Sequence, residues 1–153
     1  MNVEMAAFYR RMLSVGLSDT YERNIGLALE KEDPLSNLLL DLAFCLSDTN
    51  KTISILDNYI GDCALDENKI YPMILEEMQA LYTNNQFTLE QIAELLFKIL
   101  RGAELSFNGP WEKLTYLSYE YDEVTDGCLY MDDFLDSFAE YFLNEIGRSE
   151  NND

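Results

Sequence analysis

Tyrosines and carboxylates alternate in one short segment of this chain, YLSYEYDEVTDGCLYMDD at residues 116–133. Tyrosine offers a large contact area at a low cost in side-chain entropy, and a carboxylate accepts paired hydrogen bonds from arginine. A solvated helix usually carries a Lys or Arg four residues from each acid, and here such partners are missing. The segment therefore predicts a surface that binds a protein rich in Arg and Lys. The alternative is that the tyrosines pack inside and the acids form a solvated face. The candidate partner-binding residues are Tyr119, Glu120, Tyr121, Asp122, Glu123, Asp126, Tyr130, Asp132, Asp133, Asp136 and Glu140.

The same segment imitates part of an EF-hand calcium loop. Asp122, Asp126 and Gly127 stand where such a loop has its first, fifth and sixth residues. The third position is Val124, which has no side-chain ligand, and the twelfth is Asp133, which is shorter than the usual bidentate Glu. No second copy of the loop is present, although EF-hands normally pair. We therefore predict no metal and no cofactor.

The residue types that carry most enzyme chemistry at neutral pH are absent or scattered. The chain has no histidine, which removes the commonest general base and excludes Ser–His and Cys–His nucleophile pairs. With 29 acids in the chain, paired carboxylates occur at any spacing by chance, so they do not indicate acid–base catalysis. The seven glycines form no phosphate-binding loop. We predict no catalytic residues and no enzyme.

The cysteines and the apolar segments bear on the compartment. Cys45, Cys63 and Cys128 are odd in number and have no C-x-x-C spacing, which argues against a disulfide framework or a zinc site. Cys45 and Cys63 have apolar neighbours, so we expect buried thiols there. The first residues lack the apolar stretch of a signal peptide, and no run of 18 apolar residues exists. We expect a cytoplasmic protein that does not enter a membrane.

The candidate binding residues must be positioned by helices, because no segment shows the sustained alternation of apolar and polar residues that is typical of a β-strand. Hydrophobic repeats of helical spacing predict an all-α, single-domain bundle of about seven to eight amphipathic helices over residues 1–147. Residues 148–153 are expected to form a frayed acidic tail. Asp33-Pro34 predicts the start of the helix LSNLLLDLAFCL, which should be the most buried helix. Asp48-Thr49 predicts the capped start of the next helix. Thr88-x-x-Gln91 predicts a capping box, and Gly147 should end the last helix, which begins at about residue 131.

The net charge of the chain is −19, and it is unevenly distributed. Residues 112–153 hold 12 acids and two bases, so about a quarter of the chain carries half of the charge. Such a field repels nucleic-acid phosphates and anionic membranes, whereas it attracts and steers a basic protein. We therefore predict a basic protein partner and no direct binding of nucleic acid. The alternative is that the acidity only keeps the protein soluble.

Two stretches resemble small helical immunity proteins that protect bacteria from polymorphic or contact-dependent toxins. They are DPLSNLLLDLAFCLSDTNKTISILDNYI at residues 33–60, and residues 81–124, from LYTNNQFTLEQIAELLFKI to WEKLTYLSYEYDEV. The second is similar to the helix–turn–helix layout of immunity proteins against tRNA-cutting colicins. The likeness is one of layout and covers about half of the chain. It implies that the acids between Tyr119 and Asp136 cover a basic nuclease surface.

Three functions follow from these observations. The first is a protein-binding inhibitor, an immunity protein that neutralises a basic, nuclease-type toxin domain. The second is an acidic helical regulator or adaptor, including a nucleic-acid mimic that occupies a DNA-binding groove. The third is a metal-dependent enzyme without histidine, which fits worst because helical metal enzymes usually combine Glu with His. The first fits best, because it needs only a helical scaffold and an acidic patch.

Overall fold

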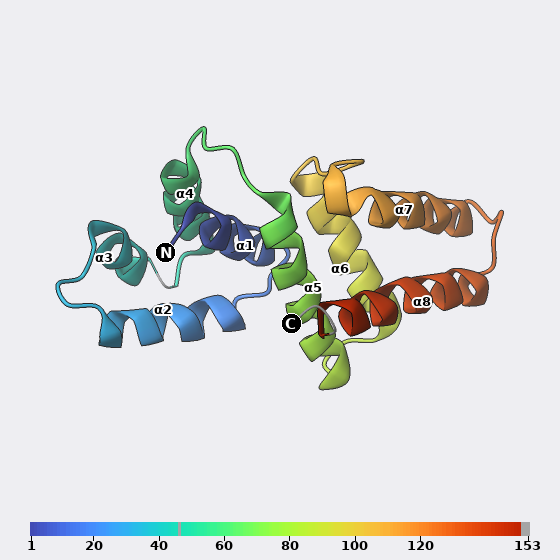
Figure 1. Ribbon diagram of the computed structural model, residues 1–153, viewed down its shortest axis with the longest axis horizontal. Coiled ribbons are helices and arrows are strands. Elements are labelled where there is room, and N and C mark those ends of the chain that lie inside the picture. The colour runs from blue at the N-terminus through green and yellow to red at the C-terminus, as the bar shows by residue number, and fades with distance from the viewer. Residues whose placement is uncertain (46, 151–153) are drawn as a thin grey trace. The chain divides into compact units, whose positions relative to one another are not determined.

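Helices make up the regular structure of this protein in the computed structural model, which describes residues 1–45 and 47–150, with the side chains of 145–150 left out (Figure 1). Over those residues there are eight α-helices, one short 3-10 helix and no strand. The all-α prediction with seven or eight helices is confirmed. The chain divides into two compact units, unit 1 at Met1–Asp66 and unit 2 at Glu67–Asp153. The single domain over residues 1–147 stays a prediction.

Unit 1 consists of four helices: α1 (Val3–Ser14), α2 (Asp19–Lys31), α3 (Asn37–Phe44) and α4 (Thr49–Ile60). Helix α1 packs along α4, and α3 contacts both α2 and α4. The rings of Tyr9 and Tyr21 join α1 to α2 in an edge-on contact with centroids 5.5 Å apart. Apolar side chains from all four helices fill the centre of the unit, namely Ala6, Met12, Ile25, Leu39, Leu42 and Leu56.

Two helix starts in unit 1 test the capping signals of the sequence. Asp48 caps α4 as its side chain accepts a hydrogen bond of 3.1 Å from the backbone N–H of Lys51. The start predicted at Asp33-Pro34 is wrong, because α3 begins at Asn37. Its N-cap is Ser36, whose hydroxyl accepts from the N–H of Leu39. A side-chain oxygen that reaches the third residue of the helix decides where the helix begins.

The helix predicted to be the most buried is among the least buried. Helix α3 has only eight residues, and Leu39 and Leu42 are its only buried side chains. Phe44 at its end is 87% exposed. A short helix that has neighbours on one side cannot bury apolar residues on all sides of its axis. The prediction of buried thiols is also wrong for Cys63, which is exposed, while Cys45 is half-buried.

Unit 2 consists of α5 (Glu67–Thr83), α6 (Leu89–Gly102), the 3-10 helix η1 (Gly109–Trp111), α7 (Glu112–Thr125) and α8 (Met131–Glu150). Helices α7 and α8 pack side by side as a hairpin, and both also contact α6 (Figure 1). The predicted capping box is present, with Thr88 and Gln91 each bonding the other's backbone N–H. Helix α8 continues past Gly147 to Glu150, so the predicted end of that helix and the start of the tail at residue 148 are wrong; residues 151–153 lie outside the described part.

Aromatic rings form the centre of unit 2. Phe138 is fully buried and packs on Phe134 and Phe142 of the same helix and on Phe97 of α6, with ring centroids 5.5–6.3 Å apart. Trp111 is also fully buried, and its indole N–H donates a 2.9 Å hydrogen bond to the carboxylate of Glu67. This interior fixes α7 and α8, which carry most of the candidate residues. Among the helices of residues 1–45 and 47–150, none is long and apolar enough to span a bilayer.

Candidate functional site

One side of α7 presents aromatic rings and carboxylates to solvent. We call Glu112, Tyr116, Tyr119, Glu120 and Glu123 the outer face of α7. Residues three and four apart share one side of a helix, which places these five in a row. Four of them are exposed and Glu120 is half-buried. The opposite side of α7 is buried in unit 2, through Leu114, Thr115, Leu117 and Ser118.

A third ring extends this face from the loop before η1. Phe107 packs on Tyr116 and Tyr119, with ring centroids 5.6 and 6.0 Å apart, and we call these three residues the aromatic cluster. Each ring remains about half exposed, at 51%, 54% and 49% for Phe107, Tyr116 and Tyr119. Three neighbouring rings that stay in contact with water are unusual on a surface that is otherwise acidic. They offer a flat, apolar contact area in the middle of the carboxylates.

The backbone of Phe107 is held in an unfavourable conformation. Its φ is +60°, in the left-handed region that bulky residues rarely adopt and that costs them about 1–3 kcal/mol. The N–H of Phe107 donates a 3.1 Å hydrogen bond to the hydroxyl of Thr115, which itself donates to the carbonyl of Trp111. The buried hydroxyl of Thr115 therefore holds the backbone from which this exposed ring projects. The sequence prediction did not include Phe107, and its only signal was an aromatic residue beside the Asn108-Gly109 turn.

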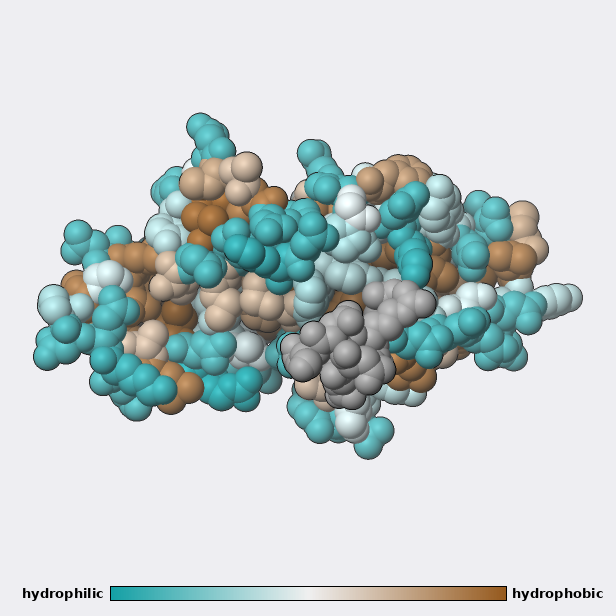
Figure 2. Space-filling model, in the orientation of Figure 1, coloured by the Kyte–Doolittle hydropathy of each residue, from teal (hydrophilic) through white to brown (hydrophobic). Residues whose placement is uncertain are grey.

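The structure places most of the predicted binding residues at the surface. The exposed ones come from α7, from the connection after it and from the first turns of α8; they are Tyr119, Asp122, Glu123, Asp126, Tyr130, Asp132, Asp133, Asp136 and Glu140. Figure 2 shows mostly hydrophilic residues along the visible, coloured side of α8. Cys128 and Leu129, in the connection between α7 and α8, are also exposed. Glu120 and Tyr121 are half-buried.

Tyr121 differs from the other candidates because it points into unit 2. Its ring packs on Phe97 and Phe134, with centroids 5.5 and 5.1 Å apart. Its hydroxyl donates a 2.7 Å hydrogen bond to the carboxylate of Glu94. The packing alternative therefore describes Tyr121 better than the binding prediction does. The hydrogen bond to Glu94, together with burial, raises the pKa of Tyr121 to about 12.

This raised pKa predicts a change in stability at high pH. A tyrosine whose folded pKa lies above its ordinary value of 10.0 keeps its proton more tightly in the folded state. Its contribution to stability is complete below about pH 10 and is lost as the pH rises toward 12. The natural chain should therefore lose unfolding free energy between about pH 9 and pH 11.5. We expect this loss to be smaller in the variant Tyr121→Phe. Urea titration of both proteins at each pH measures the difference. Equal losses in the two proteins would contradict the role of Tyr121.

The carboxylates of this region have few positive partners. Asp122 pairs with Arg101 of α6, with 3.0 Å between its Oδ1 and the guanidinium nitrogen. Among the other acids of α7 and α8 whose side chains are described, none takes part in an ion pair. Unit 2 holds 18 acids and five bases, a balance of −13. The charge of α7 and α8 therefore remains mostly uncompensated among the side chains that the structure describes.

The EF-hand alternative does not fit the local geometry. Helix α7 continues to Thr125, so the residues of the first four loop positions are helical, and only residues 126–130 connect it to α8. Gly127 has φ +80°, its N–H donates to the carbonyl of Val124, and the N–H of Cys128 donates to that of Glu123. This is the Schellman arrangement that ends a helix. In the residues that the structure describes, no three Cys, Asp or Glu side chains converge as metal ligands would.

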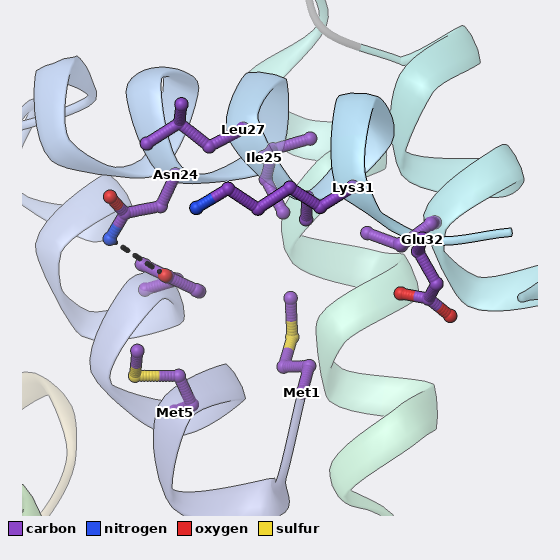
Figure 3. A pocket seen from close by; sticks show the side chains of 10 residues that line it. Met1, Met5, Asn24, Ile25, Leu27, Lys31 and Glu32 are labelled. Carbon is purple, nitrogen blue, oxygen red and sulfur yellow. Dashed lines mark hydrogen bonds between the residues drawn. The ribbon is translucent and has the colours of Figure 1, made fainter. Parts of the chain in front are cut away.

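Unit 1 contains a separate pocket of about 310 Å³ between α1, α2 and α3 (Figure 3). Met1, Met5 and Leu27 contribute to its apolar lining, whereas its rim carries both Lys31 and Glu32. In Figure 3, Lys31 extends toward Asn24, and the carboxylate of Glu32 points away from the pocket. A rim with one base and one acid selects neither anions nor cations. The outer face of α7 carries three carboxylates, which favour a cationic ligand, so it is the better candidate for a binding site.

We compared the chain with protein families, curated proteins and solved structures, and found no match in any of the three comparisons.

Proposed function

We propose that this chain is a protein-binding inhibitor of the immunity type, which neutralises a basic, nuclease-type toxin domain. The observation that carries this proposal is the uncompensated carboxylates of α7 and α8, of which only Asp122 is ion-paired among the described side chains. Carboxylates that form no ion pair among the described side chains attract the cationic surface that a nuclease uses to bind phosphates. The acidic surface would cover that cationic surface and exclude nucleic acid.

The aromatic cluster favours a protein partner over the function of a nucleic-acid mimic. A mimic presents negative charge in place of successive phosphates, whereas two tyrosine rings interrupt the carboxylates of the outer face of α7. Exposed tyrosines are common at the centre of protein–protein interfaces, where they are desolvated on binding. Their position among acids matches an interface with an apolar centre and a charged rim.

The direct test uses the product of the gene next to the one that encodes this chain. If that product is a basic nuclease toxin, we expect co-expression of this chain to restore growth of cells that produce it. In a purified mixture, an equimolar amount of this chain should abolish nucleic-acid cleavage. Unchanged cleavage at a clear excess of the chain would contradict the proposal. A complex with a DNA-binding protein that lacks nuclease activity would favour the regulator or mimic instead.

A further inference from the structure

The aromatic cluster and the carboxylates beside it form a site with two kinds of contact. Tyr116 lies one helical turn from both Glu112 and Glu120, and Tyr119 lies one turn from Glu123. The outer face of α7 therefore offers ring faces with negative charge close to each of them. Phe107 extends the ring surface toward the loop and is fixed there by its hydrogen bond to Thr115.

This combination matches the guanidinium group of arginine. Guanidinium is planar, so it stacks on an aromatic ring, and it carries several N–H donors that reach a carboxylate at the same time. The ammonium group of lysine has the charge but not the plane, and it is more strongly hydrated. Carboxylates alone attract both residues and favour arginine only through the paired hydrogen bonds that they accept from it. The exposed rings add a stacking surface that lysine cannot use in the same way.

The charge of the chain excludes two other occupants of this face. A second copy of the chain would bring another net charge of −19 against the same acids. A nucleic acid would bring its phosphates against them. A basic protein that presents arginine is the occupant whose charge and shape both match.

We infer that the aromatic cluster and two neighbouring carboxylates bind an arginine side chain of the basic partner. The cluster is Phe107, Tyr116 and Tyr119, and the carboxylates are those of Glu120 and Glu123. This inference rests on the proposed function and adds which residue type the partner presents. The two tyrosines provide the stacking surface, and the carboxylates one turn away accept hydrogen bonds from the guanidinium. The left-handed backbone of Phe107 keeps the third ring in place before the partner arrives, so less order must be created on binding.

The test compares two peptides of equal length and charge, hexa-arginine and hexalysine, by calorimetry with the full chain. We expect the arginine peptide to bind about three- to tenfold more tightly than the lysine peptide. The double variant Tyr116→Ala/Tyr119→Ala should lose most of the preference for arginine, because only Phe107 and the carboxylates of the site remain. A second variant, Tyr119→Leu, keeps an apolar side chain without an aromatic ring and should reduce the preference. Fluorescence of the buried Trp111 reports whether each variant remains folded.

The control is Phe44→Ala, which removes an aromatic ring that is 87% exposed at the end of α3 in unit 1, outside the candidate binding residues. It should leave the preference for arginine unchanged. Equal affinities of the two peptides for the natural chain would overturn the inference, and so would a preference for arginine that is undiminished in the double variant. If the chain blocks a basic nuclease but shows no preference for arginine, the inference fails and the proposed function stands. If the preference is present but no basic protein is inhibited, the proposed function fails by itself.

Discussion

Replacing Phe138 by alanine is expected to lower the unfolding free energy of unit 2 by about 3–5 kcal/mol. Phe138 is fully buried and contacts rings on both sides along α8, those of Phe134 and Phe142. It also contacts Phe97 of α6, so the substitution leaves a cavity between two helices. The rings of both helices would have to shift to fill it. The loss includes the transfer of a large apolar side chain and the ring–ring contacts.

Urea titration followed by Trp111 fluorescence measures this effect. Trp111 is the only tryptophan of the chain and is buried in unit 2, so its emission reports the unfolding of that unit. Leu143→Ala is the matched control, because Leu143 lies on the same helix but is 46% exposed. We expect it to change stability by less than about 1 kcal/mol. Similar losses in both variants would show that the stack of rings is not the centre of this unit.

The sequence predicts most helix starts, because the signals that set them are local. Asp48 caps a backbone N–H three residues ahead, and Thr88 and Gln91 cap each other across the same distance. Such bonds depend on a few neighbouring residues and on no distant part of the chain. The error at Asp33-Pro34 has the same origin, because Ser36 provides an equally local cap three residues later.

The burial of each helix could not be predicted in the same way. The apolar residues of α3 indicated a central helix, but burial depends on how many neighbours a helix has, which its own residues do not reveal. Phe44 therefore remains exposed at the end of a short helix. Helix α8 likewise continues past Gly147, since a single glycine lowers helix propensity but ends a helix only where the backbone adopts the left-handed conformation.

In the candidate site, too, features set by neighbouring residues could be predicted, whereas contacts between residues far apart in the sequence could not. The charge of α7 and α8 and the exposure of most of their acids could be predicted from composition and spacing. The partners of Asp122 and Tyr121 could not, because Arg101 and Glu94 are 21 and 27 residues away in the sequence. Phe107 was missed because its role depends on a left-handed backbone in a loop, and hydrophobic periodicity carries no signal for that.

Reversal of two acids in the second half of α7 and of Asp126, which follows it directly, is expected to have the largest effect on binding. In the triple variant Glu120→Lys, Glu123→Lys and Asp126→Lys, attraction to a basic partner becomes repulsion at the proposed interface. Like charges that face each other across an interface cost several kcal/mol, so we expect the Kd for the partner to rise about 100-fold or more. Asp122 is left intact because its ion pair with Arg101 links α7 to α6.

The fold should tolerate this variant. Glu123 and Asp126 are exposed, Glu120 is half-buried, and none of the three takes part in an ion pair among the described side chains. Glu123 and Asp126 lie at the carboxyl end of α7, where the helix dipole favours positive charge. Trp111 fluorescence should therefore show an unfolding transition close to that of the natural chain. Calorimetry at several salt concentrations should show that the affinity depends less on salt than it does for the natural chain.

A second triple variant separates a local surface from a general effect of charge. Glu22, Glu30 and Asp41 are exposed acids of unit 1, and their replacement by lysine changes the net charge of the chain from −19 to −13, as in the first variant. If α7 forms the interface, this variant should bind the partner and the arginine peptide within about threefold of the natural chain, because rim and distant charges act mainly on the rate of association. If both triple variants weaken binding equally, the chain acts through its overall field, and the outer face of α7 has no special role.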